Sequence, residues 1–175
     1  SLLRLQQLAV KDPRVRVIAL DHHHGQSAAL DAGFRAARGE WTLTLDADLQ
    51  NDPADIPRLL ALCEHADVVN GVRAKRQDSR LRVLSSRLAN AVRNALTDEA
   101  VSDVGCSLRV MRTDLLRRVK LYRGSHRFLP TLLRLEGARI LELPVSHRPR
   151  RYGRSKYGVR NRLFVGLVDL LAVRW

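Results

Sequence analysis

The sequence predicts an α/β fold with a mostly parallel sheet, flanked by helices, in a single domain. The chain has 175 residues, about the length of one domain, and 45% of them are hydrophobic, as in globular proteins. Short apolar runs alternate with helical patterns of roughly ten or more residues. This alternation is typical of βαβ units, in which neighbouring strands are parallel.

The first half of the chain alternates regularly. Residues 14–21 (RVRVIALD) alternate between polar and apolar positions and then become apolar, which predicts a strand. Residues 26–38 place apolar side chains three and four positions apart and end before Gly39, a common helix stop. The expected elements are a helix at 1–10, a strand at 14–21, a helix at 26–38, a buried strand at 40–46, a helix at 53–64 that begins with proline, and a strand at 67–73.

The second half is less regular and more basic. The most apolar stretch, residues 163–173, has 11 residues and includes Asp169, whereas a membrane-spanning helix needs about 20 apolar residues. We therefore expect no bilayer span. The expected elements are an Arg-rich helix at 79–96, a short strand at 107–111, a helix at 113–119, another helix after His126, a strand at 139–145, a loop at 146–158 and a helix at 159–175.

Charge is distributed unevenly along the chain. Residues 1–70 hold seven Lys and Arg against ten Asp and Glu, whereas residues 71–175 hold 24 against eight. A basic half indicates an anionic partner, which is a nucleic acid, a membrane surface or a phosphorylated ligand. The two cysteines, Cys63 and Cys106, are too sparse for a disulfide framework and indicate reduced thiols in a cytosolic protein.

The acidic stretch DADLQNDP follows the predicted strand at 40–46. Ligands of open α/β sheets bind at the carboxyl ends of strands, where Asp46 and Asp48 are expected to lie. Together with the amide oxygen of Gln50 they form an all-oxygen donor set, which suits Mg²⁺ or Mn²⁺. The alternative is a solvated acidic turn before a helix that begins with proline.

Several motifs resemble those of the family 2 glycosyltransferases. HGQSAALDAGFRAARGEW is followed by TLDADLQNDP, and then by GVRAKRQDS, DVGCSLRVMR, HRFLP, VSHRPRRYGRSKYG and NRLFVGLVDLLAVRW, in the family's order and spacing. The resemblance covers nearly the whole chain. It is closest to the polyprenyl-phosphate branch, which includes dolichol-phosphate mannose synthases and bacterial undecaprenyl-phosphate sugar transferases.

The resemblance implies a GT-A fold, which is Rossmann-like, and a metal-dependent reaction. A sugar would pass from a UDP- or GDP-sugar donor to a polyprenyl phosphate acceptor. By motif, Asp48 and Gln50 resemble the ligands of Mg²⁺ or Mn²⁺. Asp46, near the ribose and phosphates of the donor, and Asp48 itself resemble catalytic carboxylates. Asp103 matches a family acid near the acceptor and is a third candidate for a catalytic carboxylate.

Basic residues are expected to hold the two phosphorylated substrates, because arginine suits bidentate phosphate contacts. Arg73 ends a predicted strand and should face the same cleft as the acids. For any single arginine the alternative is a solvated surface position. The remaining candidates are Arg82 and Arg87 on the following helix, and Arg151, Arg154, Ser155 and Lys156 in the GRSKY loop.

The chain is expected to divide into a glycosyltransferase domain at residues 1–158 and an amphipathic helix at 159–175. Leucines and Phe164 in this helix, with arginines around them, suit a helix lying in a membrane interface, although ordinary core packing would suit them equally. We therefore expect a peripheral protein on the cytoplasmic face of the cell membrane. The sequence does not indicate an oligomeric state.

Two departures from the family pattern bear on function. The chain opens with a helix where the family has a strand that holds the nucleotide base, so we expect an N-terminally truncated domain. His22, His23 and His24 stand where relatives usually have an Arg-Asn pair. Three histidines can bind metal, but consecutive residues at a strand end rarely point at one ion.

Two other functions remain as alternatives. One is a catalytically inactive fragment or relative that docks on membranes. The other is a basic nucleic-acid-binding module, which would explain the charge of the second half. That module would leave DADLQ unexplained, and an aromatic content of 5% offers few stacking platforms. We therefore expect no nucleic acid partner.

Overall fold

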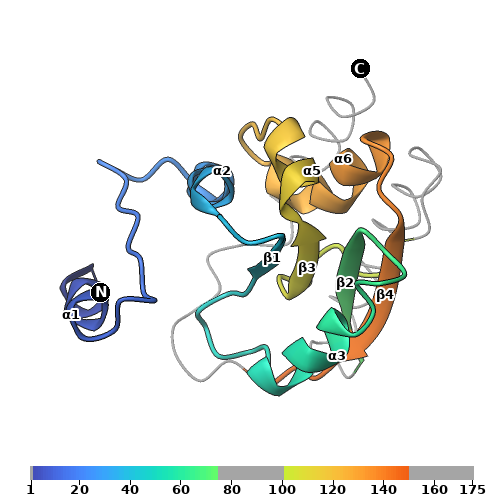
Figure 1. Ribbon diagram of the computed structural model, residues 1–175, viewed down its shortest axis with the longest axis horizontal. Helices are drawn as coiled ribbons and strands as arrows, with labels where there is room; N and C mark the ends of the chain where they lie inside the picture. Colours follow the sequence, from blue (N-terminus) through green and yellow to red (C-terminus); the bar gives the residue numbers. More distant parts are fainter. Residues whose placement is uncertain (1, 75–100, 150–175) are drawn as a thin grey trace.

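A four-stranded sheet with helices on both faces forms the centre of the computed structural model, which describes residues 2–74 and 101–149 (Figure 1). The predicted helices at 79–96 and 159–175 and most of the loop at 146–158 lie outside the described residues. The helices are α1 (Leu2–Lys11), α2 (Gln26–Ala36), α3 (Ile56–Leu60), α5 (Thr113–Arg118) and α6 (Leu129–Leu135), with 3₁₀ turns η1 (Pro53–Asp55) and η2 (Ser125–Phe128). The strands are β1 (Trp41–Thr44), β2 (Val68–Arg73), β3 (Arg109–Arg112) and β4 (Ile140–Val145).

The sheet has the order β1-β3-β2-β4. β2 and β4 are parallel, whereas β3 runs antiparallel to both β1 and β2. Three of the four strands therefore point the same way, in agreement with the predicted α/β class. The inserted β3 makes two of the three strand pairings antiparallel, so the described sheet is mixed instead of mostly parallel. The carboxyl ends of β1, β2 and β4 consequently meet at one edge of the sheet.

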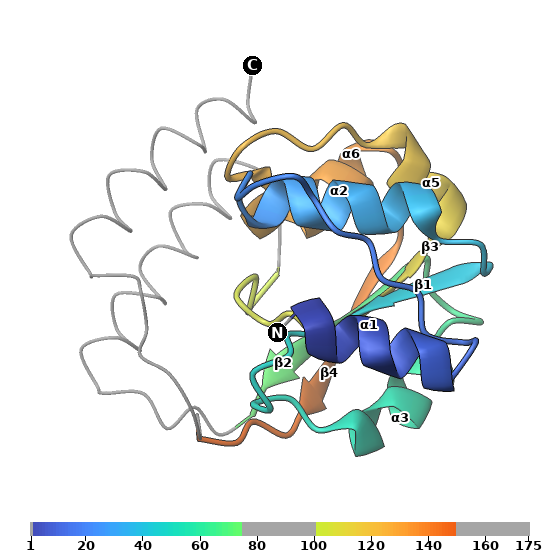
Figure 2. The same cartoon turned by 90° about the vertical axis from the view of Figure 1, so that its left-hand side faces the viewer.

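Alternating side chains build one core on each face of the sheet. Val68 and Met111 pack with α2, α5 and α6, while Val69 and Val110 pack with Leu59 of α3. The period-2 alternation of a strand produces this division, since successive side chains point to opposite faces. Figure 2 shows α2, α5 and α6 on one side of the sheet and α3 on the other.

Gly71 lets β2 lie close to its neighbours. A Cβ atom at this position would lie 2.8 Å from the carbonyl oxygen of Leu108, 3.0 Å from a Val145 methyl and 3.1 Å from the sulfur of Cys106. Backbone atoms of a central sheet cannot move aside at low cost, so only glycine fits here. The loop that enters β3 is therefore held against β2.

The strand predicted at residues 14–21 is wrong. Residues 15–20 have no regular secondary structure and pair with none of the described strands, and Ile18 and Leu20 are exposed. Their alternating pattern favours an extended backbone, but a strand also needs a hydrogen-bonding neighbour, which periodicity cannot supply. The helix predicted at 1–10 is confirmed as α1, and none of its described residues is buried.

Three elements differ in burial or extent from expectation. β1 is half-buried instead of buried, because it is an edge strand that pairs only with β3. Helix α2 ends at Ala36 instead of Arg38, since Ala37 is already extended (φ −65°, ψ 136°) and its N–H bonds to the carbonyl of Phe34. The helix predicted at 53–64 is divided into η1, α3 and a series of turns. Among residues 2–74 and 101–149, no helix has the length and apolar character to cross a bilayer.

Candidate active site

The acidic loop follows β1 at the edge where the three co-directed strands end. Asp46 is exposed, and Asp48 and Gln50 are half-buried. The Asp48 carboxylate accepts a hydrogen bond of 3.2 Å from the Gln50 N–H. Leu49 between them has a φ of +63°, a left-handed conformation that costs a non-glycine residue about 1–3 kcal/mol. Backbone strain of this kind persists where surrounding contacts impose it, which favours a binding loop over a merely solvated turn.

Ser107 attaches the acidic loop to the chain that enters β3. Its hydroxyl oxygen accepts hydrogen bonds from the Asp46 N–H at 3.2 Å and from the Asn51 amide at 2.8 Å. Its carbonyl oxygen accepts a bond of 2.7 Å from the Thr44 hydroxyl. The loop is therefore held at both ends of the DADLQ motif.

The chain that leaves β4 is also attached to the acidic loop. Asn51 and His147 form an isolated antiparallel bridge, and the Arg148 N–H donates to the Gln50 carbonyl at 2.7 Å. The Gln50 amide nitrogen donates to the Arg148 carbonyl at 3.3 Å and lies 3.4 Å from the His147 Nε2. The basic segment predicted at 146–158 therefore begins beside the acids.

Two carboxylates secure the same junction. Asp55 is buried and accepts bonds from the Ser146 N–H at 2.7 Å and from Arg58 at 2.8 Å. Burial works to raise the pKa of Asp55, but the Ser146 N–H and Arg58 outweigh it, and the net pKa is lowered. Asp52 forms an ion pair with Arg148. Asp55 is therefore a charged anchor for the chain that leaves β4.

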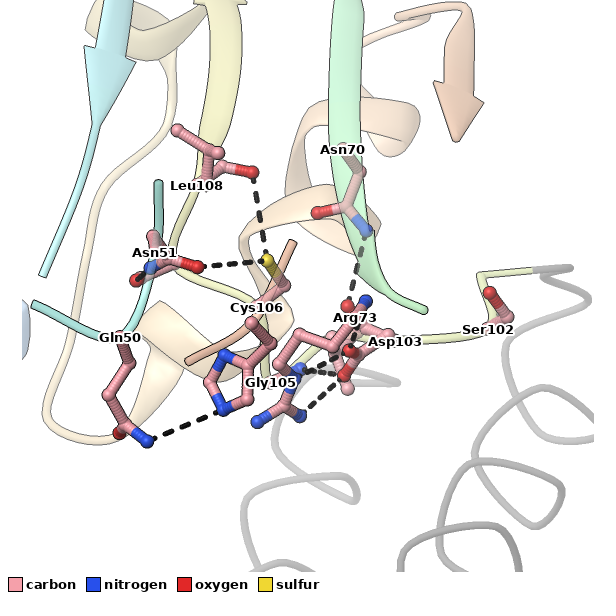
Figure 3. Close-up of polar contacts among 12 residues, drawn as sticks. Gln50, Asn51, Asn70, Arg73, Ser102, Asp103, Gly105, Cys106 and Leu108 are labelled. Atoms are coloured by element: carbon pink, nitrogen blue, oxygen red, sulfur yellow. Dashed lines mark hydrogen bonds and ion pairs between the residues drawn. The ribbon is translucent and has the colours of Figure 1, made fainter. Parts of the chain in front are cut away.

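Arg73 and Asp103 form a buried ion pair at the end of β2 (Figure 3). The guanidinium donates to both carboxylate oxygens, from Nε and Nη2, at 2.7 Å each. The N–H groups of Arg73 and Gly105 donate to the same carboxylate. A Cβ at Gly105 would lie 2.7 Å from the Arg73 Nη2, so this glycine makes room for the pair.

The pair brings together two residues that were predicted to act separately. Their side chains are 14% and 6% exposed, and each neutralises the charge of the other. The substrate-binding role of Arg73 and the catalytic role of Asp103 stay predictions. The geometry favours a positioning role for both, because the pair fixes the loop that carries Ser107.

Buried Asn70 adds a further contact within β2. Its amide nitrogen donates to the Asp103 carbonyl and to the Glu142 carboxylate, at 3.2 Å each. Glu142 in turn accepts bonds from the N–H and hydroxyl of Ser102. The segment at 101–107 is thus attached to β2 and β4 before it enters β3.

Most of the site residues that were not predicted from the sequence are those that attach the acidic loop and the segment at 101–107 to the rest of the sheet. Asn51, Asn70, Ser107, His147 and Arg148 do not form a local pattern, because their partners lie far along the chain. A polar residue within the apolar run VVNGV was the available signal for Asn70, and the motif VSHRP was the signal for His147 and Arg148. Candidates Arg82, Arg87, Arg151, Arg154, Ser155 and Lys156 lie outside the described residues.

Both cysteines are free, as predicted. Cys106 is buried beside the site, with its sulfur 3.9 Å from the Asn51 side-chain oxygen, and burial raises the pKa of its thiol. Burial also raises the pKa of Cys63. Neither is therefore an activated thiolate, and Cys106 serves as a packing residue between β2 and the acidic loop.

A hydroxyl–imidazole contact attaches α2 to η2. Ser27 Oγ lies 2.8 Å from His126 Nδ1 and accepts a hydrogen bond from the Gly124 N–H, so its proton is directed at the imidazole. Burial, aided by the charges of Arg127 and Arg109, lowers the pKa of His126 to about 4. The imidazole is therefore neutral at physiological pH.

The low pKa of His126 predicts acid destabilisation. The unfolded chain takes up this proton near pH 6.5 and the folded chain only near pH 4, so stability should fall as pH drops across that window. As pH decreases, the urea unfolding midpoint should therefore fall more steeply for the unmutated chain than for His126→Asn, which retains a hydrogen-bond acceptor. His65→Asn, at an exposed position, is the matched control. Equal slopes for His126→Asn and the unmutated chain would contradict the assignment.

Comparison with known proteins agrees with this architecture. The family model described as glycosyl transferase family 2 matches residues 2–120. An undecaprenyl-phosphate 4-deoxy-4-formamido-L-arabinose transferase from Edwardsiella ictaluri is 40% identical over 154 residues, which are 86% of this chain and 47% of that protein. A dodecaprenyl-phosphate galacturonate synthase from Rhizobium johnstonii is 39% identical over 164 residues, 91% of this chain and 48% of that protein. The chain thus spans about half the length of these relatives.

Solved structures show the same fold at lower identity. The glucosyl-3-phosphoglycerate synthase from Mycobacterium tuberculosis, crystallised with Mn²⁺, uridine diphosphate and phosphoglyceric acid, matches with a TM-score of 0.60 and 19% identity. The match covers 92% of this chain and 56% of that one. This likeness confirms the predicted GT-A fold, and the family match covers more than half of the sequence. The chain belongs to glycosyl transferase family 2.

Proposed function

We propose that this chain is the donor-binding and catalytic part of an enzyme that transfers a sugar from a nucleotide-sugar to a polyprenyl phosphate. The relatives that carry this proposal are 38–43% identical and are named for transfer to undecaprenyl or dodecaprenyl phosphate. The observation in the structure that supports it is the acidic loop, held in a strained conformation where co-directed strands end.

The donor set of this loop fits a hard divalent cation. Asp48 and Gln50 would hold Mg²⁺ or Mn²⁺, with Asp46 beside them, because carboxylate and amide oxygens are the ligands these ions prefer. Gln50 directs its amide nitrogen toward Arg148, and its amide oxygen is the atom that suits the cation. Structures of the same fold were crystallised with Mn²⁺ or Mg²⁺ and uridine diphosphate. The bound ion would neutralise the diphosphate leaving group.

The protein's own residues position the substrates. Arg148 lies beside the acidic loop, and the basic residues that follow it, Arg151, Arg154, Ser155 and Lys156, would offset the repulsion between donor and acceptor phosphates. Arg82 and Arg87 would do the same from the segment after β2. A phosphate acceptor is already ionised at neutral pH, so the reaction needs no general base. The burial of Asp103 against Arg73 is compatible with such a mechanism.

The acceptor implies a membrane location. We place the domain of residues 1–158 on the cytoplasmic face of the cell membrane as a peripheral protein, with residues 159–175 as an interfacial helix. The support for this is the amphipathic sequence of that segment and the lipid acceptors in the names of the relatives. An inactive relative that only docks on membranes would bind vesicles without turning over any donor.

A transfer assay with two acceptors tests the proposal. The 175-residue chain is incubated with Mn²⁺ and a panel of radiolabelled UDP- and GDP-sugars, with either undecaprenyl phosphate in detergent or 3-phosphoglycerate. Label should enter the organic phase with one of the donors, only when the lipid is present, and EDTA should prevent it. Label in 3-phosphoglycerate would indicate the activity of the structural neighbours, and no product with either acceptor would indicate an inactive chain.

A further inference from the structure

The histidine triplet before α2 forms a cluster that the proposed reaction does not use. Asp21, His22 and His24 place their candidate ligand atoms within 4.8 Å of one another. His24 Nε2 lies 2.6 Å from one Asp21 carboxylate oxygen, and His22 Nδ1 lies 2.9 Å from the other. The two imidazole rings lie 3.7 Å apart, between centroids. His23 is not part of the cluster.

This arrangement differs from what the sequence suggested. Consecutive residues of an extended segment alternate in direction, so three adjacent histidines were not expected to converge. In the structure the side chains of His22 and His24 instead converge on the preceding Asp21. Gly25, with a φ of +89°, then turns the chain into α2 directly after the cluster.

We propose that Asp21, His22 and His24 form a binding site for a borderline transition-metal ion, Zn²⁺ in the first instance, distinct from the site for Mg²⁺ or Mn²⁺ at Asp48 and Gln50. Two imidazoles and one carboxylate are a ligand set that suits Zn²⁺, whereas Mg²⁺ prefers oxygen ligands.

The geometry needs only a small rearrangement. Ligand atoms about 2.0–2.1 Å from a tetrahedral ion lie about 3.3 Å apart. The His24 and His22 nitrogens lie 2.6 Å and 2.9 Å from the two carboxylate oxygens, so these distances would lengthen by about 0.7 Å and about 0.4 Å. Each ligating nitrogen would lose its proton to the other ring nitrogen, a tautomer change available to neutral histidine. The side chains are 39% to 75% exposed, which leaves room for this movement.

The site would lie at the edge of a pocket. His24 also lines a cavity of about 410 Å³, together with Ser27, Asp31, Tyr122 and Arg123. Three protein ligands leave at least one position of a tetrahedral ion for water or an anionic oxygen, the pattern of catalytic and ligand-exchanging zinc sites. An ion held here would therefore be accessible to small anions.

A Zn²⁺ titration of the unmutated chain and of its substitution variants tests the proposal. Zn²⁺ is titrated into the 175-residue chain against a chromophoric chelator, with excess Mg²⁺ present throughout. We expect the unmutated chain to bind one Zn²⁺ that Mg²⁺ does not displace. Asp21→Asn and His24→Gln should each weaken binding about tenfold or more. His23→Gln and Cys63→Ser are matched controls and should leave the affinity unchanged.

A second readout separates the ligand set from non-specific chelation. Co²⁺ bound in place of Zn²⁺ should show the visible absorption bands of an ion with a low coordination number. We expect these bands in the unmutated chain and in His23→Gln, but not in His24→Gln. Circular dichroism checks that each variant folds. The proposal is overturned if no Zn²⁺ binds, if His23→Gln loses as much affinity as His24→Gln, or if Asp21→Asn binds as well as the unmutated chain.

Discussion

Asp48→Ala is expected to reduce metal-dependent sugar transfer about a thousandfold. Metal ions contribute several kcal/mol of charge stabilisation in such reactions, and about 4 kcal/mol corresponds to a thousandfold change in rate. The measurement is the initial rate of lipid-linked product against Mn²⁺ concentration. The substitution removes a carboxylate that also accepts a bond from the Gln50 N–H, so urea unfolding is measured in parallel.

Asp114→Ala is the matched control for this experiment. It removes the same charge from an exposed position on α5 and should transfer sugar at the rate of the unmutated chain. An Asp48→Ala protein that keeps the normal rate and the normal Mn²⁺ dependence would remove Asp48 from the metal site. Equal loss in both variants would show that net charge, and not the site, sets the rate.

Asp103→Ala is expected to destabilise the fold by about 3–5 kcal/mol, because it removes the carboxylate that accepts two hydrogen bonds from the largely buried Arg73 guanidinium. The measurement is the free energy of unfolding in urea. The double variant Arg73→Met/Asp103→Leu should recover much of this loss, since a buried ion pair can be replaced by apolar residues at little cost. Recovery of the free energy of unfolding in the double variant would show that the loss in Asp103→Ala comes from the broken ion pair, and not from a loop that tolerates no substitution.

Asp103→Asn separates the structural role from a catalytic one. Asparagine keeps the shape and one acceptor, so transfer should fall only as far as stability falls. A loss of transfer without a loss of stability would restore Asp103 as a catalytic carboxylate. An Asp103→Ala protein as stable as the unmutated chain would contradict the role of the ion pair.

Much of the fold could be predicted because the sequence patterns that indicate its helices and strands lie within short stretches of the chain. The run at 67–73 is apolar and bounded by turns, and β2 forms there; the periodic pattern at 26–38 became α2. The acidic loop was also predictable, since a carboxylate-rich stretch at the end of a strand is unusual. These features depend on neighbouring residues alone.

The remaining features depend on partners distant in sequence. The segment at 15–20 has the sequence pattern of a strand but pairs with none of the described strands. The antiparallel insertion of β3 follows from sheet pairing, which local periodicity does not encode. Arg73 and Asp103 are 30 residues apart, so each was interpreted alone as a ligand-binding or catalytic group, although together they form a buried ion pair.

Paramagnetic broadening by Mn²⁺ tests the central claim, that the DADLQ loop holds the divalent cation of a nucleotide-bound enzyme. Amide signals of the ¹⁵N-labelled chain are recorded with substoichiometric Mn²⁺, with and without UDP or GDP, and Mg²⁺ serves as the diamagnetic reference. Broadening should centre on Asp46, Asp48 and Gln50 and should require the nucleotide. If these three signals stay sharp in the presence of nucleotide, or if the broadening centres on other residues, the account is contradicted.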